Sequence, residues 1–289
     1  MKIRDIYVNG RKNNKTILSF EVFPPKKTSG IETVYKALDE LVELKPSYIS
    51  VTYGAGGTVD HNTALIASRI KNDLGVETIA HLTCVNNDRE SLDGELAILK
   101  EKNIENILAL RGDIVPGVEP KKDFKYASDM CKYIKEKGGF GISGACYPEM
   151  HMEAESLVDD VRHLKTKVEN GAEHLISQLF FDNSAFYSFM DMVRCAGIDV
   201  PVSAGIMPVT NVNQIQRMVS MCGASLPAKF SKIMQRYENN PEALRDAGIA
   251  YAVEQIVDLI ANGVDGIHLY TMNNPYIARK ITEAIGKLL

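Results

Sequence analysis

Two polar side chains lie inside apolar runs of this chain, and a catalytic role would explain why they are there. Glu21 lies between Phe20 and Val22, and His81 lies in the run AHLTC. A carboxyl group taken out of water acquires a raised pKa, and an acid that stays protonated near neutral pH can serve as a general acid. The alternatives are a salt-bridged glutamate at the rim of the fold and a hydrogen-bonded core histidine.

A third apolar run ends in Arg111, Gly112 and Asp113. Arg111 can hold a phosphate in a bidentate grip, and Asp113 can place a negative charge against a developing cation. The alternative is a structural ion pair between Arg111 and Asp113.

More polar residues follow other apolar runs. The amide of Gln178 precedes LFFD and wants hydrogen-bond partners, which either a heterocycle with alternating donors and acceptors or the neighbouring backbone would supply. His268 is open to interpretation as a core histidine. The remaining polar residues near the ends of these runs include Thr52, Tyr53, Tyr147, Glu149, His151, Asn211, Gln214, Tyr270 and Asn274.

Short apolar, β-rich runs alternate along the chain with stretches of helical periodicity. The predicted strands are Ile17–Pro24, Tyr48–Gly54, Thr78–Val85, Asn106–Asp113, Gly141–Pro148, His174–Asp182, Val200–Val209 and Gly266–Met272. Such alternation predicts parallel strands joined by right-handed crossovers, and eight units favour a closed (β/α)8 barrel. An open doubly wound sheet is the alternative, but no GxGxxG follows the first strand.

The helices are predicted from apolar periodicity and from residues that begin or end helices. Predicted helices cover Ile31–Leu44, Leu157–Val168, Ala185–Cys195 and Val253–Ile260, and an extra helix covers Leu226–Tyr237 between the seventh and eighth strands. Predicted N-caps are Asp88, Ser156, Ser184 and Asn211, and predicted helix-ending glycines are Gly75, Gly138, Gly171, Gly197 and Gly263. No internal boundary divides residues 1–289, so we expect a single barrel domain. Barrel enzymes work at the C-terminal ends of their strands, where the polar residues above would meet.

Composition excludes several classes of function. The net charge of −4 argues against nucleic-acid binding, and no apolar run is long enough to span a membrane. Five scattered cysteines and a polar N-terminus predict no disulfides and a cytoplasmic location. Metal motifs such as HxH and HExxH, a GxSxG elbow and a Walker lysine are absent. We therefore expect no metal, and either an organic cofactor or direct polarisation of a substrate.

The segments SFEVFPPK, VTYGAGGT, HLTCV, LALRGD, ACYPEMH, ISQLFFD, GIMPVTN and HLYTMN occur in this order. Over about residues 16–276 the chain resembles bacterial methylenetetrahydrofolate reductases. The resemblance implies a (β/α)8 barrel that holds FAD and reduces 5,10-methylenetetrahydrofolate to 5-methyltetrahydrofolate, a source of methyl groups for methionine or one-carbon metabolism. NADH or NADPH would first pass hydride to the flavin and leave. The folate would then bind over the same flavin face, open to an iminium cation and take the hydride.

The resemblance also implies a role for individual residues. Glu21 would protonate the leaving nitrogen, and Asp113 would stabilise the cation and tune the flavin potential. Gln178 would recognise the pterin, and Gln214 and Asn274 fall at other folate positions. The implied FAD contacts are Thr52, Tyr53, His81, Leu110, Arg111, Gly112, Asp113, Tyr126, Ala127, Tyr147, His151, Asp160 and Lys167.

The chain departs from its relatives at two positions. Asn274 stands where many have an arginine that grips the glutamate tail of the folate, and Arg279 is an alternative grip. His163 stands where some have asparagine. Other hypotheses are a subunit that takes electrons from a partner protein and an FAD barrel of the proline-dehydrogenase type. We also expect a homo-oligomer or a subunit of an electron-transfer complex.

Overall fold

A computed structural model describes residues 1–25, 30–53, 62–114, 117, 119–211, 215, 218–219 and 222–289. Its strands close into a barrel in chain order, and every neighbouring pair is parallel. The strands are β1 (Ile17–Val22), β2 (Tyr48–Val51), β3 (Glu77–Thr83), β4 (Asn106–Leu110), β5 (Gly141–Cys146), β6 (His174–Ser177), β7 (Val202–Ile206) and β8 (Gly266–Tyr270). The predicted closed barrel is confirmed, because each apolar run forms one strand.

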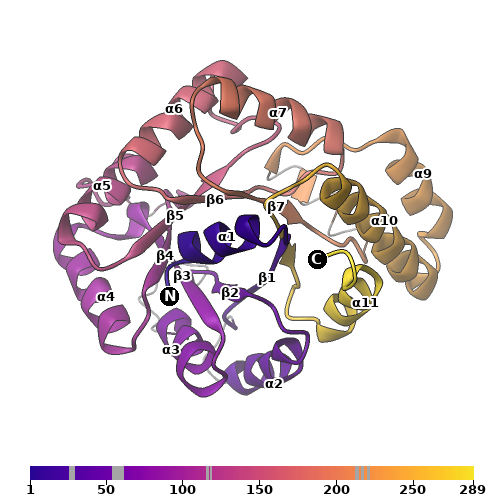
Figure 1. The fold of residues 1–289 in the computed structure, drawn as a ribbon, viewed down its shortest axis with the longest axis horizontal. Helices are drawn as coiled ribbons and strands as arrows, with labels where there is room; N and C mark the ends of the chain where they lie inside the picture. The colour runs from indigo at the N-terminus through magenta and orange to yellow at the C-terminus, as the bar shows by residue number, and fades with distance from the viewer. Residues whose placement is uncertain are drawn as a thin grey trace.

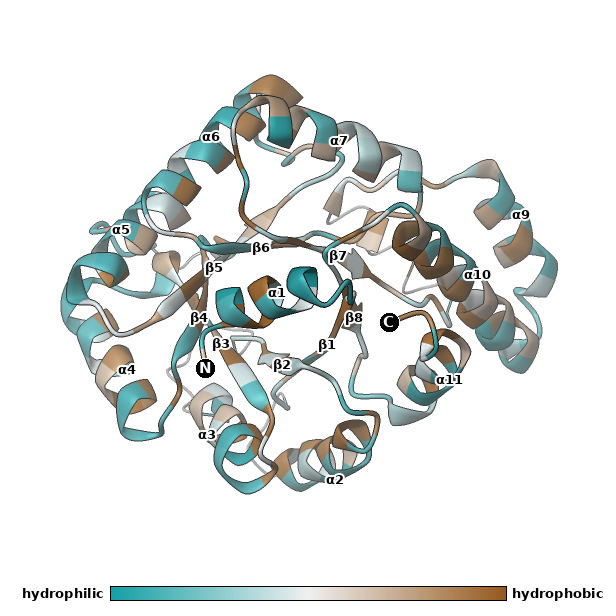
Figure 2. Ribbon diagram, in the orientation of Figure 1, coloured by the Kyte–Doolittle hydropathy of each residue, from teal (hydrophilic) through white to brown (hydrophobic). Residues whose placement is uncertain are grey.

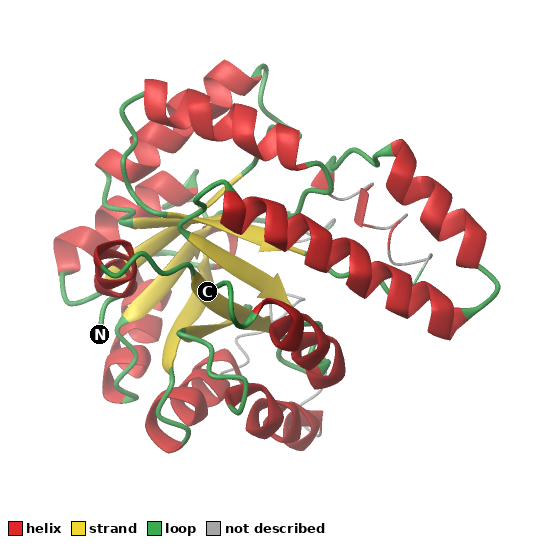
Figure 3. Ribbon diagram, turned by 45° about the vertical axis from the view of Figure 1, so that its right-hand side comes forward, coloured by secondary structure: helices red, strands yellow, loops and turns green. Residues whose placement is uncertain are grey.

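Helices surround this barrel (Figure 1). They are α2 (Ile31–Val42), α3 (Asn62–Ser68) with a π-helical turn at Arg69–Asp73, α4 (Arg89–Glu101), α5 (Ala127–Lys137), α6 (Leu157–Glu169), α7 (Asn183–Cys195), α9 (Ala228–Tyr237), α10 (Pro241–Ala261) and α11 (Pro275–Ile285). The extra helix between β7 and β8 is confirmed as α9. In Figure 3, α9 and α10 lie side by side and extend beyond the ring of helices.

Helix starts and ends mostly follow the sequence signals. Asp88 and Ser156 cap α4 and α6, and the five predicted helix-ending glycines all have positive φ. The predicted cap at Ser184 is wrong, because α7 begins earlier and the carboxylate of Asp182 accepts the Ser184 N–H at 2.9 Å. The residues that follow Asn211 lie largely outside the described part of the chain.

The helix α10 begins well before the predicted Val253–Ile260. Its first half carries charged residues and Gly248, which hide the helical apolar pattern. A Cβ atom on Gly248 would lie only 1.7 Å from the Val209 carbonyl oxygen, so glycine lets this helix pack directly on the chain after β7.

No helix was predicted before the first strand. Helix α1 (Ile3–Lys12) lies across the centre of the barrel in Figure 1, and its Tyr7 is buried against Tyr48 and Ser203. The hydroxyls of Tyr7 and Tyr48 are 3.2 Å apart. Figure 2 shows α1 largely in hydrophilic colours, which explains why its sequence did not suggest a buried helix.

The largest apolar core lies between the strands and the surrounding helices, and a second cluster beneath α9 and α10 includes Phe181, Met207 and Phe230. The barrel interior combines a smaller apolar cluster, which includes Ile17, Ile79, Leu108 and Ile176, with many polar groups. Its buried strand residues include Ser19, Glu21, Ser50, His81, Ser143, His174, Ser203 and His268. Buried polar groups need partners, so these residues define where the fold holds chemistry.

Candidate active site

Strand register places Glu21 among hydrogen-bonding groups. In the β1–β2 and β1–β8 pairs Glu21 stands opposite Ser50 and Tyr270, near the C-terminal ends of the strands. The Glu21 side chain is only 8 % exposed. Its Oε2 atom lies 3.3 Å from Ser50 Oγ and 3.4 Å from His268 Nε2. The carboxylate is therefore a buried acceptor at the centre of a small polar cluster.

The expectation that Glu21 has a raised pKa is wrong for the protein without ligands. Burial raises the pKa of Glu21, but the hydrogen bond from His268, the charges of His81 and His268 and the Ser50 hydroxyl together bring it below its usual value. The sequence argument considered an isolated carboxyl, whereas the fold supplies groups that stabilise its anion.

His81 stands beside this cluster on β3. Its Nε2 atom is 3.6 Å from Glu21 Oε2 and has no hydrogen-bond partner in the described structure. Burial lowers the pKa of His81 to about 4, so the imidazole is neutral near pH 7. A buried nitrogen without a partner at the strand ends is a polar position that a ligand can satisfy.

The end of β4 carries the Arg111-Gly112-Asp113 segment. Gly112 has a φ of +83°, and a Cβ there would lie 2.7 Å from Val85 and 2.8 Å from Thr83. Only glycine allows the chain to pass so close to the end of β3. Asp113 is exposed. Burial raises the pKa of Tyr147 to about 12, and the charge of Asp113 adds to this shift.

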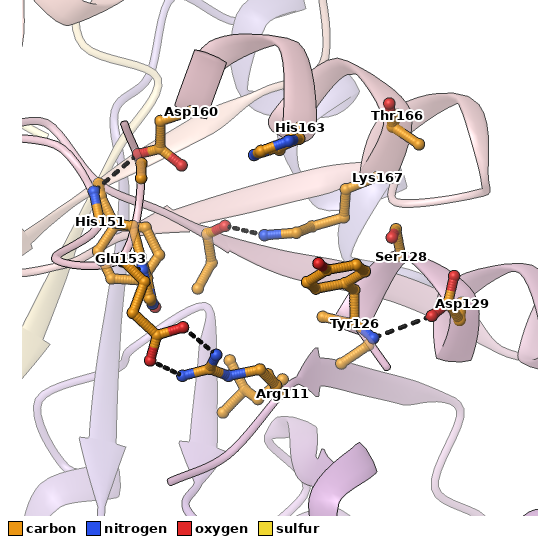
Figure 4. Close-up of a pocket in the computed structure, with 16 residues that line it drawn as sticks. Arg111, Tyr126, Ser128, Asp129, His151, Glu153, Asp160, His163, Thr166 and Lys167 are labelled. Atoms are coloured by element: carbon orange, nitrogen blue, oxygen red, sulfur yellow. Dashed lines mark hydrogen bonds and ion pairs between the residues drawn. The ribbon is translucent and has the colours of Figure 1, made fainter. Parts of the chain in front are cut away.

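A cavity of about 460 Å³ opens beside β4 and β5, between the start of α5 and the face of α6 that carries Asp160, His163 and Lys167 (Figure 4). Eight of the residues implied for FAD line it, namely Leu110, Arg111, Tyr126, Ala127, Tyr147, His151, Asp160 and Lys167. Thr52, Tyr53, His81, Gly112 and Asp113 are not among its lining residues and lie at the ends of β2, β3 and β4. The predicted set thus falls into a cavity group and a strand-end group.

Two cations face this cavity. Lys167 Nζ donates to the Ala145 carbonyl oxygen at 2.6 Å, and burial lowers the pKa of Lys167 against the opposing influence of Cys131, Cys146 and Asp160. Arg111 forms a bidentate ion pair with Glu153, in which Nη2 lies 2.8 Å from Oε1. The alternative pairing of Arg111 with Asp113 is therefore wrong.

Turn geometry arranges the loop between β5 and α6 around the cavity. The backbone N–H of His151 donates to Asp160 Oδ2 at 2.9 Å, and the Tyr147 and His151 rings pack edge to face at 4.7 Å. The contact of Asp160 is therefore to a backbone amide in the protein itself, which fixes His151 beside the cavity.

The residues implied for folate give a mixed result. The side-chain oxygen Oε1 of Gln178 accepts the Leu179 N–H at 2.9 Å, as the alternative of a backbone partner predicted. The side-chain N–H₂ of Gln178 is then the group that can donate to a ligand. Asn274 caps α11 through a 3.4 Å bond from the Ile277 N–H. Arg279 pairs with Glu43 at 3.0 Å. Gln214 lies outside the described residues.

Sequence reasoning gave no site role to Ser50 and His268, which contact Glu21: Ser50 was not singled out, and His268 was open to interpretation as a core histidine. It also missed Glu153, which pairs with Arg111. Alternation along a strand gives a signal for the first two, since inward positions recur every second residue. No comparable pattern marks Glu153, because it lies in a loop.

Other absences concern only the described part of the chain. No group of three or more histidine, cysteine or acidic residues there is arranged to hold a metal ion. No helix among these residues is long and apolar enough to cross a membrane. All five cysteines are free, as predicted.

A parallel eight-stranded barrel with a buried carboxylate and a cation-lined cavity at its C-terminal strand ends has the architecture of a barrel enzyme. The model of the methylenetetrahydrofolate reductase family matches residues 6–286, and the chain belongs to that family.

Curated relatives agree with this membership. The 5,10-methylenetetrahydrofolate reductase of Pectobacterium carotovorum is 37% identical over 93% of this chain and 90% of its own, and that of Escherichia coli K12 is 36% identical over the same shares. The methylenetetrahydrofolate reductase (NADH) 1 of Arabidopsis thaliana is 37% identical over 94% of this chain but only 49% of its own. The chain thus spans about half the length of its plant and fission-yeast relatives.

Solved structures show the fold without showing the function. A Clostridium thermocellum protein that binds 5-methyl-5,6,7,8-tetrahydrofolic acid matches with a TM-score of 0.62 at 14% identity, over 98% of this chain and 99% of its own. A tryptophan synthase chain from M. tuberculosis matches with a TM-score of 0.60 at 12% identity, over 97% of each chain. Such different proteins on one barrel mean that function must be argued from the site.

Proposed function

We propose that this chain reduces 5,10-methylenetetrahydrofolate to 5-methyltetrahydrofolate, with FAD as cofactor and NADH or NADPH as donor in a ping-pong sequence. The observation that carries the proposal is Glu21, a buried acid at the strand ends beside the unpartnered nitrogen of His81. Family membership supplies the substrate class. The name of the Arabidopsis relative supports NADH as the donor.

The cavity residues fit a group that carries a diphosphate. Arg111 and Lys167 would hold its two phosphates, because each places a cationic N–H donor at the cavity wall. Tyr126 and Tyr147 would cover its flat or apolar parts, and His81 Nε2 would gain a partner at the strand ends. When bound, FAD would accept a hydride from the nicotinamide donor and deliver it to the folate carbon.

Glu21 would deliver the proton that opening of the folate ring requires at the leaving nitrogen. In the free protein its carboxylate is stabilised by Ser50 and His268, so ligand binding must favour the protonated form before it can act. Exclusion of water by a bound substrate shifts the equilibrium in that direction, since burial raises a carboxyl pKa. The proton then passes from Glu21 Oε2 to the nitrogen as the C–N bond breaks.

Asp113 would stabilise the cation that remains after ring opening. It is exposed at the mouth of the barrel, where an anion can face a substrate without a large desolvation cost. Gln178 would use its amide N–H₂ for the pterin, and Gln214 keeps its proposed folate role. Asn274 is engaged at the start of α11, so a bidentate grip on the folate tail has to come from another residue.

We further propose that the protein works in the cytoplasm as a homo-oligomer or within an electron-transfer complex. The Glu21 cluster favours folate reduction over amine oxidation of the proline-dehydrogenase type, which has no ring-opening step.

The test is anaerobic reduction of the FAD-reconstituted protein with NADH, NADPH or dithionite in parallel. Bleaching of the flavin band by either nucleotide supports the ping-pong proposal. Bleaching by dithionite alone would contradict the nucleotide donor and point to a partner protein.

A further inference from the structure

One of the two cations of the cavity, Arg111, is already paired with a carboxylate of the protein itself. Glu153 holds both terminal nitrogens of the Arg111 guanidinium, with the Nη2–Oε1 distance at 2.8 Å. Both residues line the cavity, and Figure 4 shows the pair across its lower side. The arginine that would bind a phosphate is therefore neutralised in the free protein.

The position of Glu153 lets its side chain leave without a change in the fold. It lies in a turn closed by the 2.9 Å bond from the Ala154 N–H to the His151 carbonyl oxygen. Its own N–H donates to His151 Nδ1 at 3.1 Å, so the backbone is fixed. The side chain is 62 % exposed, so it can rotate into solvent.

The Arg111–Glu153 pair and a phosphate ligand compete for one edge of the guanidinium. Glu153 takes the edge formed by Nη1 and Nη2, so a phosphate can bind that edge in bidentate geometry only after the carboxylate leaves. A diphosphate and Glu153 are also both anions, so they repel each other within a cavity of about 460 Å³. Binding of the diphosphate at Arg111 must therefore displace the carboxylate or bind less well beside it.

We propose that Glu153 is a displaceable internal anion that sets the affinity of this cavity for a diphosphate ligand. The inference rests on the proposed use of FAD and adds a residue that weakens, rather than provides, cofactor binding. In the free protein Glu153 pairs with the Arg111 guanidinium. By competing with the ligand for Arg111, it makes the cofactor exchangeable.

The test is the dissociation constant for FAD, measured by flavin fluorescence on wild type and Glu153→Gln apoprotein. The variant should bind FAD about three- to tenfold more tightly, since a bidentate pair at a partly exposed site has a modest energy to be overcome. The FAD-induced rise in Tm should increase accordingly. Glu155→Gln is the matched control, because it removes the same charge at a position two residues from Glu153. The Glu155 side chain is exposed and does not line the cavity.

A second comparison tests whether the gain in FAD affinity comes from breaking the Arg111–Glu153 pair. In an Arg111→Met background, Glu153→Gln should give no gain in FAD affinity, because the shared cation is gone.

Equal or weaker FAD binding by Glu153→Gln, with normal binding by wild type, would overturn the inference and leave the proposed function standing. A persistent gain in the Arg111→Met background would also overturn it. Failure of wild type and both glutamine variants to bind FAD would overturn the proposed cofactor and this inference together.

Discussion

Glu21 Oε2 and His268 Nε2 lie 3.4 Å apart on adjacent strands, although 247 positions separate the two residues in sequence. His268 Nδ1 in turn lies 2.7 Å from Ser19 Oγ, which fixes the imidazole ring. The histidine therefore orients the acid and contributes to the lowering of its pKa.

Glu21→Gln should retain reduction of the flavin by the donor and lose reduction of the folate. An amide keeps the shape of the side chain but has no acidic proton, and loss of a general acid slows a step by about 10²–10⁴-fold. Stopped-flow measurement of the two half-reactions gives the comparison, with the donor half-reaction as internal control. A normal folate rate would remove Glu21 from the mechanism.

His268→Leu should move the alkaline limb of the folate half-reaction to higher pH. The hydrogen bond from His268 lowers the pKa of Glu21, so its removal raises that pKa, and a general acid acts below its pKa. His268→Gln keeps a donor and should restore much of the original profile. Identical pH profiles for wild type and His268→Leu would show that His268 does not act through Glu21.

Asp113→Asn should retain FAD and slow the folate half-reaction by about fivefold, which corresponds to about 1 kcal/mol, the size of one charge interaction at about 4 Å in water-like surroundings. Glu119→Gln is the control, because it removes the same charge from an exposed residue of the same connection after β4. Equal rates for wild type and Asp113→Asn would exclude cation stabilisation by this residue.

Acid should destabilise the fold through His174. Burial lowers the pKa of His174 to about 3 from an ordinary value of 6.5, between the hydroxyls of Ser143 and Ser203. Between these pH values the unfolded chain binds a proton that the folded chain does not. The contribution of His174 to the free energy of unfolding is therefore complete above about pH 6.5. As the pH falls from there, the free energy of unfolding decreases by up to about 1.4 kcal/mol per pH unit for this histidine.

Urea unfolding of the apoprotein from pH 7 to pH 5 measures this slope. His174→Gln should reduce this slope by the share of one histidine and leave the share of His81, whose pKa is also lowered by burial. His163→Gln changes an exposed histidine and should not reduce the slope. A slope unchanged in His174→Gln would contradict the assignment.

The barrel was predictable because each strand is an apolar run and five of the connections back to a strand carry a helix-ending glycine, namely Gly75, Gly138, Gly171, Gly197 and Gly263. Helix α1 was not, since its apolar residues face a barrel end that the sequence alone does not define. The half of α10 that begins at Pro241 was missed for a related reason, because Gly248 breaks the pattern while providing close packing.

The site was predictable only in part. Eight residues that the resemblance implies for FAD line one cavity. The strand-end argument accounts for Leu110, Arg111 and Tyr147, whereas Asp160 and Lys167 reach the cavity from α6. The state of Glu21 was not predictable, since it depends on the register that brings Ser50 and His268 beside it. The position of Glu153 beside Arg111 depends on the turn at His151, and no apolar periodicity in the sequence predicts that turn.

The most direct test of the proposed activity adds 5,10-methylenetetrahydrofolate anaerobically to the FAD-loaded, reduced protein and follows the flavin band. Return of the oxidised spectrum with formation of one equivalent of 5-methyltetrahydrofolate is the predicted result. A flavin that stays reduced in the presence of the folate would contradict the account.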